Sequence, residues 1–174
     1  DDYGPGVHLV VAEDSYGGPV GALRIHVRST ADPLPVERAL PDHDRLNRSI
    51  RERTAEGVGE YTGLWVVERF RGCGLSAALV STALAASPLL GAFEGVAFTH
   101  HHLRFWNPLG FDVDQTVGGI IYPDSRYRSS VLWIDTAILA DTEPLHRQMI
   151  LGLRVALSQP KPIYLHPEAA ATLR

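Results

Sequence analysis

The sequence predicts one α/β (α+β) domain: a mixed, mostly antiparallel sheet with a central parallel pair of strands and helices on both faces. Two observations point to this fold class. Segments 60–67 and 92–100 are strand-like apolar runs joined through an alanine- and leucine-rich helical segment, and such a crossover makes the two strands parallel. The short apolar runs on either side of this unit are separated by turn-forming residues, which is typical of antiparallel hairpins.

The first hairpin is predicted over residues 7–28. Residues 7–13 (VHLVVAE) are a short apolar run, and residues 14–19 (DSYGGP) are dense in turn formers. Residues 20–28 alternate between two faces of a strand, with Leu23, Ile25 and Val27 on one face and Arg24, His26 and Arg28 on the other. This alternation predicts a half-buried strand.

A polar connection follows this hairpin. Residues 29–57 contain three prolines and many charged side chains, which predicts a loop with one or two short, exposed helices. The strand at 60–67 (EYTGLWVV) comes next and leads into a glycine-containing segment. Beyond it, a helix that Pro88 stops is predicted from residues at helical spacing: Leu75, Ala78, Leu79, Thr82, Ala83 and Ala86.

The last third of the chain predicts a strand, a short helix, a second hairpin and a final helix. The strand covers 92–100, and the segment HLRFWNPLGF reads as a helix that Gly110 closes. The hairpin pairs residues 117–122 with 131–139. The final helix, capped by Asp141 or Thr142, is expected to bury the residues that recur at helical spacing: Leu145, Met149, Leu153 and Ala156.

Composition narrows the possible classes of protein. A chain of 174 residues suits one domain over 1–174, with 141–174 as its C-terminal helix and tail, and the first residues suggest that further N-terminal elements precede it. The net charge of −4 gives no reason to expect nucleic-acid binding. A single cysteine forms no disulfide framework or metal site, and no apolar run approaches the ~20 residues of a membrane span, so we expect a cytoplasmic protein.

The join between strand and helix, RFRGCGLS at 69–76, contains the chain's most informative motif. Glycines there let a ligand approach the backbone, and the first N–H groups of a helix together with its dipole favour an anion. Arg69 or Arg71 would add positive charge. The alternative is a tight turn that needs glycine at left-handed backbone angles.

The segment VVERFRGCGLSAALV resembles the pyrophosphate-binding motif of the GCN5-related N-acyltransferase (GNAT) superfamily. Arg71, Gly72, Gly74 and Ser76 fall on that motif, and LRFWNPLGF is similar to a second superfamily segment. The resemblance implies an acyl-CoA or acyl-phosphopantetheine donor, with no metal, whose pantetheine arm lies between splayed strands 60–67 and 92–100. The residues it implies for donor binding are Val66, Val67, Arg69, Arg71, Gly72, Cys73, Gly74, Leu75, Ser76 and Trp106.

One branch of the superfamily is more similar still. Autoinducer synthase-like and long-chain N-acyl amino acid synthases carry Glu-x-Ser/Thr-Arg-Leu before the glycine loop, and Glu60, Thr62 and Leu64 match this pattern. Gly63 stands where that branch has its arginine. The branch implies a medium or long acyl chain and an acyl carrier protein as a partner, with acetyl transfer from CoA as the alternative.

Two kinds of residue are candidates for activating an amine. Glu60 lies on the strand beside the expected donor, and its alternative role is a solvated carboxylate at a strand end. His100, His101 and His102 end the neighbouring strand, and imidazole has a suitable pKa for a base near neutrality. Adjacent strand residues point to opposite faces, so the three cannot converge on one metal ion, and surface or capping roles are the alternative.

Other side chains have weaker claims. The superfamily often places an acidic tyrosine where this chain has Trp106, whose indole would pack in the core or against the pantetheine arm. Cys73 is expected to contribute its backbone. Tyr61, Trp65 and Trp133 are candidate pocket residues, and core packing is their alternative role. Arg24, Arg126 and Arg128 are candidate contacts to a carrier protein or an acceptor carboxylate, and a solvated surface is their alternative.

The sequence therefore predicts an N-acyltransferase that moves an acyl group from a thioester to an amine of a small molecule or amino acid. The alternative is a catalytically lapsed relative that binds acyl-CoA or a partner without turnover. Glu60 and His100 are the candidate catalytic residues. We expect a monomer or dimer without nucleic-acid partners or a membrane span.

Overall fold

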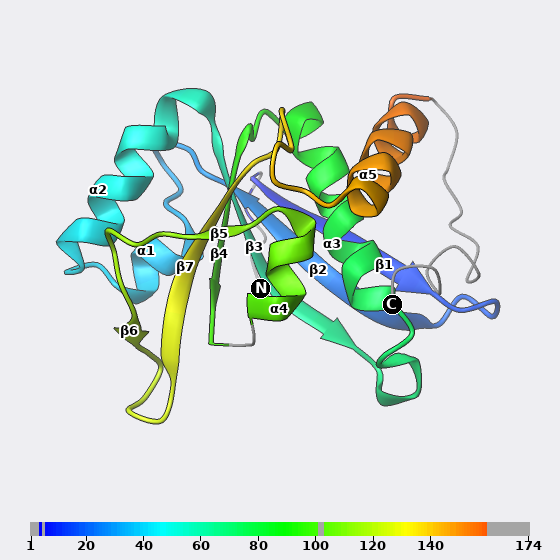
Figure 1. The fold of residues 1–174 in the computed structure, drawn as a ribbon, viewed down its shortest axis with the longest axis horizontal. Coiled ribbons are helices and arrows are strands. Elements are labelled where there is room, and N and C mark those ends of the chain that lie inside the picture. The colour runs from blue at the N-terminus through cyan, green and yellow to red at the C-terminus, as the bar shows by residue number, and fades with distance from the viewer. Residues whose placement is uncertain (1–3, 5, 101–102, 160–174) are drawn as a thin grey trace.

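The computed structural model describes residues 4, 6–100 and 103–159 and shows a seven-stranded mixed sheet (Figure 1). The strand order is β1-β2-β3-β4-β7-β5, and β6 pairs with β7 outside this path. The strands are β1 (Val7–Glu13), β2 (Pro19–Val27), β3 (Val58–Val66), β4 (Glu94–Thr99), β5 (Asp112–Val113), β6 (Ile120–Ile121) and β7 (Arg128–Asp135). The pair β3–β4 is parallel and its neighbours are antiparallel, as the crossover predicted.

Helices cover both faces of the sheet, which confirms the predicted fold class. Helices α1 (Pro35–Ala39) and α2 (Asp44–Arg53) lie on one side, and α3 (Leu75–Ala86) and α5 (Pro144–Leu157) lie on the other (Figure 1). The short α4 (Leu103–Trp106) follows β4. Short 3₁₀ turns complete the chain at Thr54–Glu56, Glu68–Phe70, Ser87–Leu90 and Asn107–Leu109.

Each sheet face has its own apolar core. On the α3–α5 face, Leu23 and Ile25 of β2 pack with Tyr61 of β3 and with α3 residues such as Leu79 and Leu84. On the α1–α2 face, Val58 and Val96 pack beneath Leu34, Val36, Leu46 and Ile50. Alternation along the strands supplies one face and then the other, so a single strand contributes to both cores.

The prediction for residues 29–57 was wrong about exposure. Leu34, Val36, Leu46 and Ile50 are at most 2% exposed because α1 and α2 form the cover of one sheet face. The strand beneath them is consequently not half-buried, and His26 on its polar side is only 9% exposed. Because the segment contains many charged residues, its few buried apolar residues were not recognised from the sequence.

Smaller corrections concern the C-terminal third. The N-cap of α5 is Glu143, not Asp141 or Thr142, and the Thr142 hydroxyl instead donates a hydrogen bond to the Leu109 carbonyl. The buried positions of α5 are His146, Ile150 and Leu153, whereas Leu145 is 46% exposed. The hairpin β6–β7 forms as predicted, but residues 136–139 lie beyond the end of β7 in a turn. Strand β5 was not anticipated.

Within the described ranges, no helix is both long and apolar enough to cross a bilayer.

Candidate active site

The parallel strands β3 and β4 pair along the first four residues of β3 and then separate. Their ladder runs from Val58–Glu94 to Tyr61–Ala97, and the described residues form no further β3–β4 pair although β3 continues to Val66. Figure 1 shows β3 running away from β4 towards the loop before α3. This divergence leaves backbone groups of β3 available on the side that faces β4.

A bulge at Gly63 accompanies the divergence. Along the β2–β3 ladder Arg24 pairs with Thr62 and Ala22 pairs with Trp65, so β3 holds one extra residue in this interval. Gly63 has φ +66°, a left-handed conformation that glycine adopts without strain. Gly63, where the resemblance leads us to expect an arginine, therefore has a structural role in the bulge.

The loop that follows β3 presents free backbone N–H groups. Gly72 and Gly74 have φ +73° and +84°, and Gly74 is the N-cap of α3. The first intrahelical bond runs from Ala78 N–H to the Gly74 carbonyl. In the described part of the chain, the N–H groups of Leu75 and Ser76 therefore have no acceptor. A helix of 12 residues adds its dipole, so this loop is suited to bind an anion.

Some side chains of the loop are bound to other protein groups, and others are available to a ligand. Arg69 pairs with Asp14 in the β1–β2 turn, with 2.9 Å between Nη2 and Oδ2. The Cys73 thiol donates to the Phe70 carbonyl at 2.8 Å. Arg71 is exposed, and among the described residues its side chain makes a single, long hydrogen bond of 3.4 Å from Nε to the Val66 carbonyl. Arg71 is thus the better placed of the two arginines to meet an anion.

Val66, the last residue of β3, and Val67, directly after it, contribute differently from the loop. The Val66 side chain is buried in the core beneath α3, and the Val67 N–H donates to the Val20 carbonyl of β2. Arg71 and residues 72–76 lie together in one loop, whereas Val66 and Val67 form the strand end that leads into it.

Glu60 is a buried carboxyl group on the α1–α2 face. It is 4% exposed, and Oε2 accepts a 2.9 Å hydrogen bond from the Val36 N–H in the first turn of α1. Burial raises the pKa of Glu60 to about 7, against the opposing effects of the Val36 hydrogen bond and the charges of Arg38 and Arg24. A carboxyl group with this pKa can exchange a proton near neutrality.

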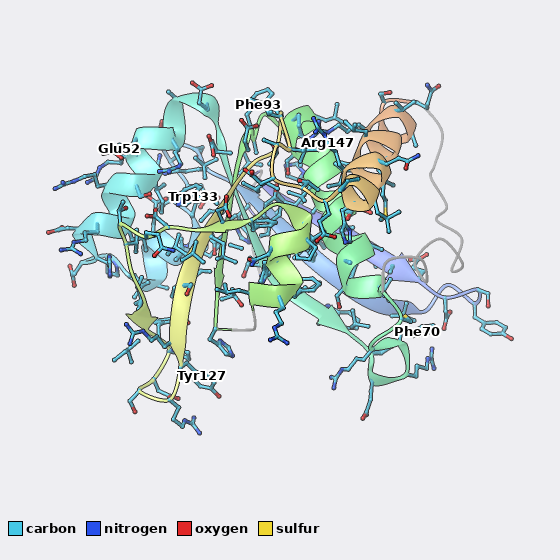
Figure 2. The ribbon with its side chains drawn as sticks, viewed as in Figure 1. Glu52, Phe70, Phe93, Tyr127, Trp133 and Arg147 are labelled. Atoms are coloured by element: carbon cyan, nitrogen blue, oxygen red, sulfur yellow. The ribbon has the colours of Figure 1, made fainter. Side chains whose placement is uncertain are left out.

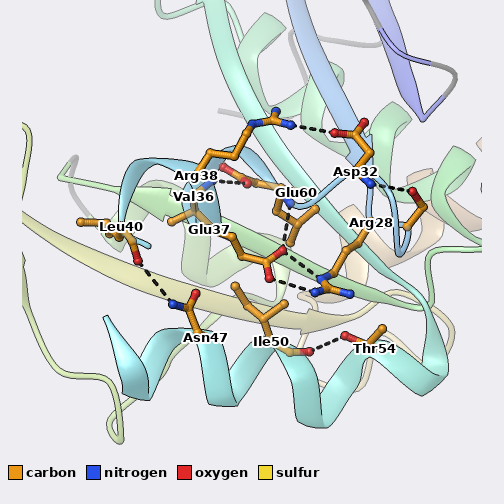
Figure 3. A network of polar contacts seen from close by, with 12 residues as sticks. Arg28, Asp32, Val36, Glu37, Arg38, Leu40, Asn47, Ile50, Thr54 and Glu60 are labelled. Atoms are coloured by element: carbon orange, nitrogen blue, oxygen red, sulfur yellow. Dashed lines mark hydrogen bonds and ion pairs between the residues drawn. The ribbon is translucent and has the colours of Figure 1, made fainter. Parts of the chain in front are cut away.

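Helix α1 is fixed over Glu60 by a polar network (Figure 3). Arg28, directly after β2, donates two hydrogen bonds to Glu37, at 2.9 and 3.0 Å, and Glu37 also accepts from the Leu34 N–H. Arg38 pairs with Asp32 at 2.7 Å. The bidentate pair Arg28–Glu37 joins α1 to the residue that follows β2, and this contact holds the Val36 N–H in place over Glu60.

His100 does not lie with Glu60. In the parallel ladder Glu60 pairs with Val96, and His100 lies four residues further along, about 13 Å at the rise of a strand. Its ring packs against Tyr127, with 4.5 Å between centroids, and Tyr127 lies directly before β7, far from Phe70 of the glycine-containing loop (Figure 2). His101 and His102 lie outside the described residues.

Trp106 is 6% exposed and packs edge-on against Phe105 and Phe111. It belongs to the core of the α3–α5 face. Its indole N–H is buried and has no hydrogen-bond acceptor among the residues that the structure describes. A buried donor without a partner costs about 1–3 kcal/mol.

The remaining candidates are mostly structural. The Tyr61 hydroxyl lies 2.6 Å from Ser87 Oγ in the core, and the Trp133 indole donates to Asp114 at 2.9 Å. Trp65 is 44% exposed, on the part of β3 that pairs with β2 but no longer with β4. Arg126 pairs with the neighbouring Asp124. The arrangement therefore does not bring Tyr61, Trp65 and Trp133 into one pocket.

The sequence analysis missed His26 and Asp114. His26 pairs with Glu60 across the β2–β3 ladder, and its Nε2 is buried without a partner in the described part of the structure. Asp114 accepts hydrogen bonds from Ser49, Thr116, Val117 and Trp133. The strand alternation that grouped His26 with Arg24 was a usable signal for the first, and no local pattern marked the second.

Comparison with curated proteins gives relatives without an assigned activity. No protein-family model matches the chain. The uncharacterized proteins Rv1356c of Mycobacterium tuberculosis and Mb1391c of Mycobacterium bovis are each 30% identical over 139 residues, which is 75% of this chain and 52% of theirs. The chain thus spans about half the length of the curated relatives it matches.

Comparison with solved structures is more informative. FeeM, an N-acyl amino acid synthase from uncultured soil microbes, has a TM-score of 0.63 at 14% identity and covers 80% of this chain and 78% of its own. The CoA-dependent acyl-homoserine lactone synthase MesI has a TM-score of 0.59 at 20% identity, covering 92% and 73%. A spermidine N-acetyltransferase of Vibrio cholerae has a TM-score of 0.52 at 11% identity, covering 80% and 71%. At these identities the likeness establishes the shared fold.

Proposed function

Because the chain has the GNAT fold, we propose that it is an N-acyltransferase that moves an acyl group from a thioester to an amine. One observation carries the proposal: the buried carboxyl group of Glu60, with a pKa of about 7, lies one residue before the point where β3 and β4 separate. A proton acceptor thus lies beside the part of the sheet where a donor would enter. The similar solved structures include N-acyl and N-acetyl transferases, which supports this assignment.

The donor side fits a phosphopantetheine group. Free N–H groups at the start of α3 and the exposed Arg71 suit phosphate oxygens, and the left-handed glycines keep side chains away from the loop backbone. The orphan indole N–H of Trp106 is a further donor that an amide or carbonyl oxygen would satisfy. When bound, the donor supplies an acyl carbon activated as a thioester. Gly72, Cys73, Gly74, Leu75 and Ser76 would hold its phosphates.

Glu60 is the proposed general base. An ammonium group must lose a proton before its nitrogen can attack a carbonyl carbon, and a carboxylate with a pKa near 7 is half ionised at neutral pH. The Val36 N–H holds one carboxylate oxygen at 2.9 Å and leaves the other without a partner among the described residues. That second oxygen, Oε1, is the atom assigned to take the proton.

The departing thiolate needs no acid from the described residues. An ordinary thiol has a pKa of about 8.5, so the thiolate can take its proton from water. It can also take the proton that Glu60 has removed from the amine. Trp106 cannot serve, since an indole N–H is not acidic at accessible pH. Tyr61 is excluded because burial raises its pKa and its hydroxyl is engaged with Ser87. Catalysis in this site therefore rests on proton removal and positioning.

The activity is tested by free-thiol release. Acetyl-CoA, octanoyl-CoA and octanoyl acyl carrier protein would each be offered with a panel of amines, including amino acids, polyamines and aminoglycosides. We expect amine-dependent thiol release with at least one donor. Donor binding without release for any amine would favour the catalytically lapsed alternative, in which the chain binds acyl-CoA without turnover.

The donor site is tested separately with Gly74→Val. Bulk and backbone strain at φ +84° should abolish CoA binding measured by calorimetry. Gly118→Val is the matched control, since Gly118 has φ +74° in a loop distant in sequence and should retain binding. Arg71→Glu repeats the test without backbone strain. Wild-type affinity in folded Gly74→Val and in Arg71→Glu would exclude this loop as the phosphate site.

A further inference from the structure

The glycine-containing loop, residues 68–74, makes one polar contact outside its own segment. Its other hydrogen bonds in the described part of the chain have both partners within residues 66–78. Arg69 is the exception, because its Nη2 donates to Asp14 Oδ2 at 2.9 Å, across 55 residues of sequence. The loop that is suited to bind an anion is therefore tied to the β1–β2 turn by this ion pair.

Asp14 is a fixed partner for that contact. Its Oδ1 accepts hydrogen bonds from the N–H groups of Tyr16 and Gly18, both at 3.0 Å, and these bonds close the β1–β2 turn. The hydrogen bonds from Gly18 and Tyr16, and to a lesser extent the charge of Arg69, lower the pKa of Asp14 and keep it ionised. The turn thus presents one oriented carboxylate oxygen to the loop.

Arg69 is held from a second side by an aromatic ring. Its guanidinium carbon lies 5.2 Å from the centroid of the Phe70 ring, which is a cation–π contact. The Phe70 side chain in turn packs against the core of the α3–α5 face. Arg69 therefore links the turn, the loop and the core, whereas Arg71 keeps its guanidinium exposed to a ligand.

Two glycines make an external tie useful to this loop. Gly72 and Gly74 both have positive φ angles, and a Cβ atom at Gly72 would meet nothing within 4 Å, so no packing restrains that position. Glycine has more backbone freedom to lose than any other residue. A loop that becomes ordered only when it binds a ligand loses affinity by that amount, and a loop that is already ordered does not.

We propose that Asp14 is a positioning residue for the donor, which acts through Arg69 by holding the glycine-containing loop in its anion-binding conformation. This inference rests on the proposed function and adds a positioning residue to its donor site. The phosphates are bound by the free N–H groups at the start of α3 and by Arg71. Arg69 itself makes no contact with the donor.

This role and simple charge attraction predict opposite effects of Asp14→Asn. The change removes a negative charge beside the loop and frees Arg69, so electrostatics alone would tighten the binding of CoA. Asparagine keeps Oδ1 as an acceptor for Tyr16 and Gly18, so the turn should stay closed. We expect CoA binding, measured by calorimetry, to weaken by about two- to fivefold, which is typical of the loss of an exposed ion pair.

Variants of Arg69 assign the effect to the ion pair. Arg69→Gln should weaken CoA binding as much as Asp14→Asn does, and the double variant should be no weaker than the stronger single one. Arg69→Lys keeps a cation for Asp14 and should recover most of the affinity.

The matched control is Asp124→Asn in another exposed turn. Asp124 pairs with Arg126 at 2.8 Å, and the Arg126 guanidinium lies 5.4 Å from the Tyr127 ring centroid, so this turn has the same kinds of contact. Tyr127 lies far from Phe70 (Figure 2). Asp124→Asn should bind CoA as the wild type does.

Hydrogen exchange of the free protein gives a readout that needs no donor. The amides of residues 70–76 should exchange faster in Asp14→Asn and Arg69→Gln than in the wild type or in Asp124→Asn. With acetyl-CoA as the donor, Asp14→Asn and Arg69→Gln should raise KM and leave kcat unchanged, since Glu60 is not altered.

The outcomes separate this inference from the proposed function. Tighter CoA binding in Asp14→Asn, with weaker binding in Arg69→Gln, would show that Arg69 contacts the donor and would overturn the positioning role. Wild-type affinity in all variants would also overturn it and would leave the proposed phosphate site standing. Failure of the wild type to bind CoA would overturn the proposed donor site, and the positioning role with it.

Discussion

Two buried carboxyl groups on the α1–α2 side of the molecule have opposite acidities. Glu60 and Asp114 are 4% and 8% exposed, yet the pKa of Glu60 is raised to about 7 and that of Asp114 is lowered to about 2. Burial favours the neutral acid in both. In Asp114 hydrogen bonds from Ser49, Thr116 and Trp133 outweigh it.

The number of donors that reach each carboxylate explains the difference. Asp114 accepts five hydrogen bonds, which tie α2, the β5–β6 loop and β7 together. Glu60 accepts one among the described residues, from Val36. A saturated carboxylate is a structural anchor, whereas a carboxylate with one partner keeps an oxygen available for a substrate. The two isosteric changes Glu60→Gln and Asp114→Asn therefore test the comparison directly.

The largest expected effect is on turnover in Glu60→Gln. Loss of a general base should lower kcat by about 10²–10⁴-fold with little change in donor affinity. Measurement of thiol release between pH 6 and 9 should also show the wild-type rate rising as Glu60 deprotonates around pH 7, a limb that the variant lacks. A wild-type rate in Glu60→Gln across this range would transfer the role of base to His100 or to a bound water.

The same variant should be more stable than the wild type at alkaline pH. The unfolded chain releases the Glu60 proton near pH 4.5 and the folded protein near 7, so the unfolded state binds fewer protons in between. The stability of the wild type therefore falls as the pH rises across this interval, by up to about 3 kcal/mol, and then levels off. Glu60→Gln avoids that loss.

Urea unfolding at pH 4, 6 and 8 measures the difference in free energy of unfolding between the two proteins. We expect no difference attributable to this titration at pH 4 and the largest gain for Glu60→Gln at pH 8. A difference that stays constant with pH would show that Glu60 titrates normally in the folded state, and the proposed base would lose its main support.

Asp114→Asn should act in the opposite sense, on stability and not on chemistry. The amide leaves buried donors of Ser49 or Trp133 unpaired, which should cost about 2–3 kcal/mol of unfolding free energy at neutral pH. In the wild type the contribution of Asp114 is present above its ordinary pKa of 3.8 and is lost as the pH falls through about 2. Turnover per folded molecule should stay within about threefold. A fall like that of Glu60→Gln would end the distinction between the two carboxylates.

The sequence predicted the sheet, the crossover and the glycine loop because each depends on local periodicity or on turn residues. It identified Glu60 as a candidate but could not show its burial, which depends on Val36, 24 residues away, packing α1 over the strand. The link between Asp114 and Ser49 spans 65 residues. The separation of His100 from Glu60 follows from the register of the parallel ladder. These three features depend on strand register and helix packing between distant parts of the chain, which local sequence patterns do not reveal.

The smallest expected effect concerns Trp106, which stands where the sequence resemblance leads us to expect a tyrosine. Its ring packs against Phe105 and Phe111, and its indole N–H cannot leave as a proton, so the ring contributes packing and at most one hydrogen bond. Trp106→Phe should therefore slow the thiol-release rate by less than tenfold, about 1.4 kcal/mol. If residue 106 lies beside the leaving group, as the resemblance implies, Trp106→Tyr supplies a hydroxyl acid there and should equal or exceed the wild-type rate. The two variants also separate the roles of ring and acid, because both keep an aromatic ring and only one carries an acidic proton. A hundredfold loss of rate in both variants, with donor affinity preserved, would show that the indole N–H donates a hydrogen bond in the transition state. Proton removal by Glu60 would then not be enough to explain the rate.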